Sequence, residues 1–229
     1  MFGNIFGELI FMIKGVIFDV DGTLFDSMGA WHDSGYNVLK SLGIDADKRI
    51  GDIFFSMTMD EVVDYIKENF SVNESRDFLK NGIHNQVEYA YRNEIELKPG
   101  VMRILDWMKD SKIPATIATS TDRFLIEIGL ARLGIEDYFD EIYTATEVGK
   151  GKNYPDIFQL AMDKMGTKPE ETWLFEDGLY SMITAKAYGM PVVGVYDKVS
   201  HDDQDAIKQV ADIYLEDLRD LNFEDFLRR

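Results

Sequence analysis

The sequence predicts an α/β protein in which a doubly wound parallel sheet carries an inserted helical domain. Two observations support the sheet. Short apolar runs alternate with helical patterns along most of the chain, and the first of these runs ends in two carboxylates. Ligands of open α/β sheets bind at the carboxyl ends of the strands, so acidic side chains there indicate a site. A third observation supports the insertion, because residues from about 28 to 96 contain no convincing buried strand.

The first expected strand is the apolar run Val16–Phe18. A β-branched and aromatic run without polar interruption is typical of a parallel strand that is buried on both faces. Asp19 and Asp21 follow it directly, and a Gly-Thr-Leu turn comes next. Burying carboxylates beside apolar residues is costly unless a cation or hydrogen bonds compensate their charge. We therefore interpret Asp19 and Asp21 as part of a functional site rather than as a turn capped by an acid.

The inserted segment that follows this strand is expected to be helical. Asp26 and Ser27 are N-cap residue types, and the helical pattern that they begin ends at Gly43. The tripeptide Lys98–Gly100 marks the end of the insertion. We expect a core domain of residues 1–26 and 97–229 and a helical domain of residues 27–96. Further amphipathic stretches within the helical domain are Met59–Ile66, Glu74–Leu79 and Ile83–Tyr91.

The remainder of the chain alternates strands with helices, which predicts parallel strands joined by right-handed crossovers. Apolar, β-rich runs predict strands at Ala115–Ala118, Glu141–Thr144, Trp173–Phe175, Val192–Val195 and Ile213–Leu215. Helical patterns lie between them at Val101–Lys109, Arg123–Leu133, Asp156–Met165 and Ser181–Tyr188.

The composition is that of a folded, acidic protein. Of its 229 residues, 45% are hydrophobic, which is enough to form a sizeable core. The formal charge of −18 argues against non-specific binding to nucleic acid or to anionic membranes, and an anionic substrate needs a local cation. The chain has no cysteine, so disulfides, thiolate nucleophiles and cysteine zinc sites are excluded. We expect a cytoplasmic monomer that binds neither nucleic acid nor membranes.

Residues 1–11 are apolar, but they lack the basic region and the cleavage site of a signal peptide and are too short to span a bilayer. We expect Met12 to be the native start. Residues 1–11 are then an upstream extension or an ordered tail with no catalytic role.

Three later strand ends carry residue types that suit phosphate chemistry. Thr119 and Ser120 end one strand where a helix is expected to follow. A hydroxyl and backbone amides could hold phosphate oxygens there, although such a turn is more often a simple N-cap. Lys152 lies before another helix, and a lone lysine is most often a solvated surface charge.

Glu176 and Asp177 end a further apolar strand and repeat the pattern of the first one. An isolated Glu-Asp-Gly sequence is a common turn. Placed opposite Asp19, however, these carboxylates suit Mg²⁺, which prefers oxygen ligands and keeps several waters. The sequence therefore predicts a magnesium site at this edge of the sheet.

The order of these residues resembles the haloacid dehalogenase (HAD) superfamily, specifically its phosphatases and phosphoglucomutase-like members with a helical, C1-type cap. The resemblance covers residues 13 to about 217. Its specific motifs are Asp-x-Asp-Gly-Thr-Leu, which begins at Asp19, and Lys-x-x-Pro-Asp-x-Phe, which begins at Lys152. The resemblance implies a Rossmann-like core, a cap formed by the helical insertion, and phosphoryl transfer through a phospho-aspartate.

The resemblance also implies a role for each residue at the strand ends. Asp19 would attack phosphorus, and Asp21 would protonate the leaving oxygen and later activate water. Mg²⁺ would be held by the Asp19 carboxylate, the Asp21 carbonyl and Asp177, with Glu176 ligating it or lying close by.

Thr119 and Lys152 would neutralise the equatorial phosphate oxygens. The other residues expected to bind phosphate are Gly22 and Ser120. The cap residues expected nearest the substrate are Trp31, Phe55, Met57 and Met59.

Two departures from the family pattern favour hydrolysis over isomerisation. Sugar phosphomutases of the family typically have a His at the position of Trp31, and their cap carries Gly, Ser and Arg. Here the corresponding cap segment, Phe54–Met59, has no Arg. A mutase must hold a second phosphate on its intermediate, so the missing Arg weakens that interpretation.

We therefore expect an Mg²⁺-dependent phosphatase of a small phosphorylated metabolite, such as a sugar phosphate or a nucleotide. A hexose-phosphate phosphomutase of the β-phosphoglucomutase type is the nearest alternative. A haloalkanoate dehalogenase is a less favoured alternative. Its chemistry needs only the first Asp of the motif and would not require Asp21 or an acidic metal site. A non-catalytic phospho-receiver module also uses a cluster of Asp residues, a Thr and a Lys. The insertion of ~70 residues after the first strand argues against it, because compact domains seldom carry long unexplained connections.

Overall fold

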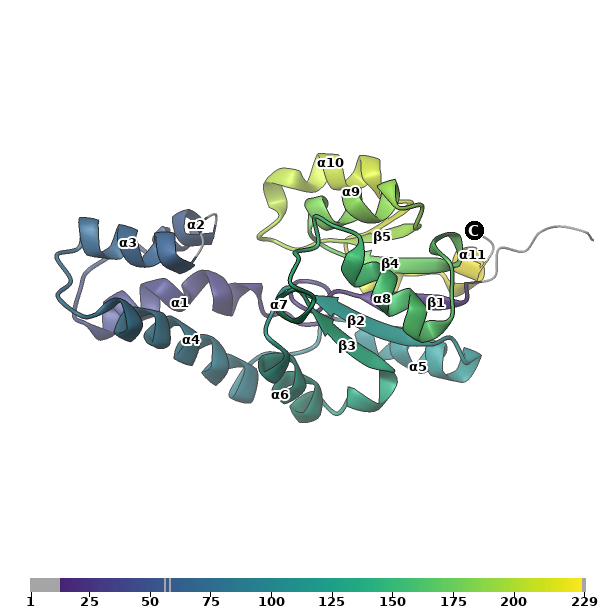
Figure 1. Ribbon diagram of the computed structural model, residues 1–229, viewed down its shortest axis with the longest axis horizontal. Helices are drawn as coiled ribbons and strands as arrows, with labels where there is room; N and C mark the ends of the chain where they lie inside the picture. Colours follow the sequence, from purple (N-terminus) through teal and green to yellow (C-terminus); the bar gives the residue numbers. More distant parts are fainter. Residues whose placement is uncertain (1–12, 56, 58, 228–229) are drawn as a thin grey trace, which may run out of the picture. The chain divides into compact units, whose positions relative to one another are not determined.

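A computed structural model describes residues 13–55, 57 and 59–227 (Figure 1). The expectation for residues 1–11 lies outside the described residues. The described chain divides into two compact units. The first unit contains residues 13–24, Lys98–Thr121 and 137–227, and the second contains Phe25–Leu97 and Asp122–Glu136.

The first unit is built on a six-stranded sheet in which neighbouring strands run parallel in the order β3-β2-β1-β4-β5-β6. The direction of the strand order changes at β1, so β1 and β4 flank the point where such sheets bind ligands. The predicted fold class is confirmed, and no predicted strand differs from the observed one by more than one residue at either end. The strands are β1 Gly15–Phe18, β2 Ala115–Thr119, β3 Glu141–Thr144, β4 Thr172–Glu176, β5 Val192–Val195 and β6 Ile213–Leu215.

Helices cover this sheet, and the longer ones were predicted from the sequence. The observed helices of the first unit are α5 Val101–Ser111, α7 Ala145–Val148, α8 Asp156–Met165, α9 Leu179–Ala187, α10 Gln204–Val210 and α11 Phe223–Leu227. The predicted helices corresponding to α5, α8 and α9 are confirmed. The other three were not predicted, because segments of four to seven residues are too short to show a helical period.

The two faces of the central strands pack against different helices, because successive side chains of a strand point to opposite faces. Ile17 and Leu174 belong to the core formed with α8, α9 and α10. Phe18 and Phe175 pack against each other with ring centroids 4.8 Å apart, and the ring centroid of Phe226 in α11 lies 5.9 Å from that of Phe175. Burial on both faces explains why these strands have no polar alternation.

The second unit is helical. Its helices are α1 Met28–Ser41, α2 Ile50–Phe55, α3 Met59–Asn69, α4 Arg76–Asn93 and α6 Arg123–Leu133. Its core contains Leu39, Val63, Ile66, Leu79 and Ile83. Ser27 occupies the N-cap position of α1, although its side chain makes no capping hydrogen bond.

The helix α4 is continuous where the sequence predicted two separate stretches. Gly82, a residue type that lowers helix propensity, lies between the two stretches. In the structure a Cβ at Gly82 would lie 3.2 Å from Cγ2 of Val38. The glycine therefore allows α1 and α4 to approach closely, and this tertiary contact outweighs the propensity.

The helix α6 matches its predicted limits, and its contacts place it in the second unit. Arg132 Nε donates to the carbonyl oxygen of Tyr91 at 2.8 Å. Gly129 lies directly against the ring of Phe25.

No described helix is both long enough and apolar enough to cross a membrane.

Candidate active site

The pairing of β1 with β4 brings the two acidic strand ends together. Phe18 pairs with Phe175, and the amide of Asp19 then donates to the carbonyl oxygen of Phe175 at 3.0 Å. The ladder thus continues one residue beyond β1 and sets Asp19 beside Glu176. Both side chains lie at the carboxyl end of the sheet, where the sequence predicted a site.

Lys152 joins these two carboxylates from the loop before α8. Its Nζ lies 2.7 Å from Oδ1 of Asp19 and 2.7 Å from Oε2 of Glu176. The side chains of Lys152, Asp19 and Glu176 are only 2%, 8% and 2% exposed. The sequence alone could not exclude a solvated surface lysine, whereas the structure places Lys152 in a buried ion-pair network.

Glu176 is held by three donors. Besides Lys152, the Oγ of Ser181 donates to Oε2 at 2.6 Å, and the amide of Gly178 donates to Oε1 at 3.0 Å. These contacts fix the carboxylate, so that it orients the ammonium of Lys152. In the sequence Ser181 was only the start of a predicted helix, and its position in the first turn of α9 explains why it reaches Glu176.

Asp177 completes the cluster and has different partners. The Oγ1 of Thr23 donates to its Oδ1 at 3.2 Å, and the Oγ of Ser200 donates to its Oδ2 at 3.3 Å. Gly22 packs against the same carboxylate: its φ is +81°, and an added Cβ would lie 2.5 Å from Oδ2 of Asp177. Only glycine fits this turn, because the backbone has a positive φ and because there is no room for a Cβ.

The cluster carries more negative than positive charge. Burial, followed by the charge of Glu176, raises the pKa of Asp19 to about 8, although Lys152 acts in the opposite direction. Burial also raises the pKa of Asp177 well above its usual range, and neighbouring carboxylates add to the effect. For Lys152, burial lowers the pKa, but the two carboxylates outweigh it and raise the pKa well above its usual value.

This electrostatic imbalance fits a divalent cation. Asp19, Glu176 and Asp177 each offer an oxygen within 4.8 Å of the others. One ammonium cannot neutralise three buried carboxylates, and a hard cation with oxygen ligands would remove the remaining repulsion. The donor set therefore suits Mg²⁺. The oxygens of Glu176 accept three hydrogen bonds, whereas those of Asp177 accept two.

Asp21 and the hydroxyl-bearing turn after β2 lie at the same edge. Thr121 Oγ1 donates to Oδ2 of Asp21 at 2.7 Å. Thr119 is buried, and its Oγ1 accepts from the amide of Thr121 at 3.1 Å. Ser120 is exposed, and its side chain hydrogen-bonds to Tyr180. Sequence reasoning did not assign a role to Thr121, although it belongs to the same Thr-Ser-Thr turn.

The expected cap residues belong to the second unit. Trp31 lies on α1 and is half-buried, while Met57 and Met59 pack against the core of this unit. The side chain of Phe55 is outside the described residues. Their predicted role in substrate binding stays a prediction.

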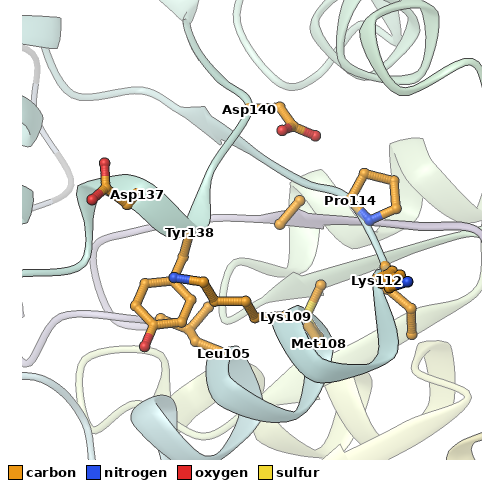
Figure 2. Close-up of a pocket in the computed structure, with 10 residues that line it drawn as sticks. Leu105, Met108, Lys109, Lys112, Pro114, Asp137, Tyr138 and Asp140 are labelled. Carbon is orange, nitrogen blue, oxygen red and sulfur yellow. The ribbon is translucent and has the colours of Figure 1, made fainter.

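A separate cavity of about 300 Å³ lies at the other end of the strands (Figure 2). Pro114 and Ala115 at the start of β2, together with Asp140 before β3, form part of its wall. Lys109 lies over the ring of Tyr138, with Nζ 4.7 Å from the ring centroid. None of the residues that line this cavity belongs to the carboxylate cluster, so it is not the candidate active site.

Comparison with known proteins gives a family match over most of the chain. Residues 16–195 match the family model described as haloacid dehalogenase-like hydrolase. A phosphorylated carbohydrates phosphatase of Thermotoga maritima is 26% identical over 178 residues, which cover 78% of this chain and 82% of that protein. Hexitol phosphatase B of Escherichia coli is 26% identical over 219 residues, which cover 94% and 97%. The chain spans about half the length of several other curated phosphatases that it matches.

A solved structure of a Thermotoga maritima protein assigned as a beta-phosphoglucomutase has a TM-score of 0.81 to this chain, at 24% identity. The match covers 93% of this chain and 99% of that one. At this identity the likeness shows a shared fold, and it carries no conclusion about the reaction.

Proposed function

The chain belongs to the haloacid dehalogenase-like hydrolase family, and on that premise we propose that it is an Mg²⁺-dependent phosphatase of a small phosphorylated metabolite. The observation that carries this proposal is the contact between Lys152 and Asp19, in a cluster that also contains Asp177. A nucleophile, a cation for the phosphate and ligands for a metal thus occur at one edge of the sheet.

The first step of the proposed reaction is attack of an Asp19 carboxylate oxygen on phosphorus, in line with the leaving oxygen. A bond forms between Asp19 and phosphorus, the bond to the leaving oxygen breaks, and Asp21 gives that oxygen a proton. The hydrogen bond from Thr121 Oγ1 to Asp21 Oδ2 restricts the Asp21 side chain and so defines where the proton is delivered.

The second step regenerates the enzyme. Asp21 takes a proton from water, the water oxygen attacks phosphorus, and the bond between phosphorus and Asp19 breaks to release inorganic phosphate. Bound Mg²⁺, held by Asp19, Asp177 and the carbonyl of Asp21, would supply positive charge opposite the phosphoryl oxygens. Lys152 stabilises the same oxygens, with Glu176 setting its direction.

The phosphate itself would be held at the turns that follow β1 and β2. We assign Gly22, Thr119 and Ser120 to this role. Thr119 is buried at the end of β2, and Gly22 lies against Asp177, so both are fixed by their surroundings. Fixed donors of this kind contribute most to phosphoryl transfer, because little covalent chemistry is required of the protein.

The curated relatives support a phosphorylated sugar or sugar alcohol as the substrate class, since two of them are named for phosphorylated carbohydrates and for hexitols. The test is a panel of phosphorylated metabolites with phosphate release and isomer formation measured on the same samples. A phosphatase releases phosphate from at least one sugar phosphate. Isomer formation without net phosphate release would instead establish a mutase, and no turnover even of an aryl phosphate would favour the receiver alternative.

Removal of metal is expected to abolish phosphate release, and added Mg²⁺ is expected to restore it. Ca²⁺ should restore it poorly, because its larger and looser coordination shell does not keep the in-line geometry. Asp177→Asn should strongly raise the Mg²⁺ concentration that gives half-maximal turnover, whereas Asp163→Asn on the exposed face of α8 should not. Full turnover in excess chelator would contradict the metal assignment.

We further propose that residues 27–96 act as the cap that selects the substrate. The segment is a helical insertion between the Asp19 motif and the strand that ends at Thr119, and a cap of this kind would exclude water during the reaction. Trp31 and Met57 are the residues assigned to substrate contact. Because Met57 also packs on the core of its own unit, its contribution has to be separated from stability.

Trp31→Ala or Met57→Ala is expected to raise KM for the physiological sugar phosphate and to change the order of preferred substrates. Turnover of a small aryl phosphate should change much less, because its reacting atoms contact only the core residues. Steady-state kinetics on both substrates, together with the melting temperature, checks this. Equal loss on all substrates with a lowered melting temperature would mean that these side chains serve packing alone.

A further inference from the structure

Lys98 is a partly buried lysine with no assigned role, and it contacts two loops of the first unit. Its Nζ donates to the carbonyl oxygens of Gly22 and Tyr196, each at 2.6 Å, and to Oδ2 of Asp197 at 2.9 Å. The side chains of Lys98 and Asp197 are 13% and 7% exposed. An ammonium group has three donors, so these contacts satisfy it completely.

One of these two loops follows β1 and holds Oδ1 of Asp177. Lys98 fixes the carbonyl of Gly22 and therefore the plane of the peptide that joins Gly22 to Thr23. Thr23 then donates through Oγ1 to Oδ1 of Asp177. Gly22 is in van der Waals contact with the same carboxylate, so a small movement of this turn displaces Asp177.

The other loop follows β5 and holds Oδ2 of Asp177. Asp197 accepts from Lys98 through Oδ2 and from the amide of Val199 through Oδ1 at 2.9 Å. The next residue, Ser200, donates to Oδ2 of Asp177. Lys98 thus ties together the two loops whose hydroxyls hold the two oxygens of Asp177.

Lys98 also offsets unfavourable charge. The carboxylate of Asp197 is one of the negative groups that act on Asp177. Without the ammonium, Asp197 would be buried with an uncompensated charge, and the loop that carries Ser200 would have to move to hydrate it. Either change would alter the position of Asp177.

We propose that Lys98 is a positioning residue that sets the affinity of Asp177 for the divalent cation, without touching metal or substrate. This inference rests on the proposed function, in which Asp177 is a metal ligand. Partners that orient metal ligands typically contribute about 10- to 100-fold in metal affinity.

Lys98→Met tests the proposal, because methionine keeps much of the side-chain volume and removes the charge and the donors. Mg²⁺ binding to the substrate-free protein is measured by calorimetry, and the Mg²⁺ dependence of aryl phosphate turnover is measured separately. We expect binding to weaken by about 10-fold or more. Turnover at saturating Mg²⁺ should fall much less than this.

Lys198→Met is the matched control, since it removes one exposed positive charge from the same loop. It should leave Mg²⁺ binding unchanged. Ser200→Ala removes a single hydroxyl from one of the two arms and should weaken Mg²⁺ binding by a smaller factor than Lys98→Met. This variant keeps the proposal testable even where Lys98→Met does not fold.

Unchanged Mg²⁺ affinity in folded Lys98→Met would overturn the proposal, and so would unchanged affinity in Ser200→Ala if the lysine variant fails to fold. A lowered melting temperature with normal Mg²⁺ affinity would show a purely structural role. If the wild-type protein binds no Mg²⁺, the proposed function fails. If the wild-type protein binds Mg²⁺ and these variants do so equally well, only the inference about Lys98 fails.

Discussion

Asp19→Asn is expected to abolish phosphate release, with a fall in kcat of more than about 10⁴-fold. The amide has the shape of the carboxylate but cannot form the phospho-enzyme. The fold should be retained, because the amide oxygen can still accept from Lys152 at the position of Oδ1. Steady-state turnover of an aryl phosphate, together with the melting temperature, measures both effects.

Asp21→Asn should fail differently and serves as the internal comparison. It keeps the nucleophile and removes the general acid and base, a loss of typically 10²–10⁴-fold. With a good leaving group, the first step needs little protonation, so phospho-enzyme should form and then accumulate. Residual turnover in Asp19→Asn comparable to that in Asp21→Asn would contradict the assignment of the nucleophile.

Lys152→Met is expected to reduce both stability and activity strongly. It leaves Asp19 and Glu176 buried next to each other without their shared cation. Breaking a buried ion pair from one side costs about 3–5 kcal/mol. The loss of positive charge beside the phosphate should reduce turnover in the fraction that remains folded. Chemical denaturation and aryl phosphate kinetics measure the two losses.

The destabilisation by Lys152→Met should depend on pH in a defined direction. The pKa of Asp19 is already raised to about 8 in the folded protein, and removal of Lys152 raises it further. A carboxyl group whose folded pKa lies above its unfolded pKa favours the folded state at low pH, and that stability is lost as the pH rises through the folded pKa. The wild type stops losing stability from this group near pH 8, whereas the variant, with the higher folded pKa, continues to lose it. The variant should therefore lose more stability relative to the wild type at about pH 9 than at about pH 5.

Lys150→Met is the control for this experiment. Lys150 is half-exposed and forms its ion pair with Asp156 near the surface. Exposed pairs of this kind contribute little to stability. Equal destabilisation by the two lysine variants, or a loss at about pH 5 as large as the loss at about pH 9, would contradict the account of the buried network.

The sequence was sufficient for those parts of the fold that are set by local pattern. All six strands were predicted because each is a short apolar run bounded by turn residues, and α6 and α8 were predicted to the residue. The helices α2, α7, α10 and α11 were missed, because four to seven residues do not reveal a period. The continuity of α4 through Gly82 was missed because it depends on contact with α1.

The candidate site shows the same division. Asp19, Lys152, Glu176 and Asp177 were predicted to act together, and the structure brings them into one buried cluster. The supporting contacts were not predictable, because they join distant segments and leave no local signal. The sequence indicates only that Lys98 is part of a turn. In the structure its ammonium donates to the side chain of Asp197, 99 residues further along the chain.

The central claim is that the phosphoryl group passes through the carboxylate of Asp19. The most direct measurement uses Asp21→Asn with Mg²⁺ and an aryl phosphate, followed by rapid quenching, reduction with borohydride and peptide mass spectrometry. An aspartyl phosphate is reduced to homoserine, so the account predicts this conversion at Asp19 and its absence in samples without substrate. Conversion at another residue, or release of phosphate with no conversion at Asp19, would contradict the account.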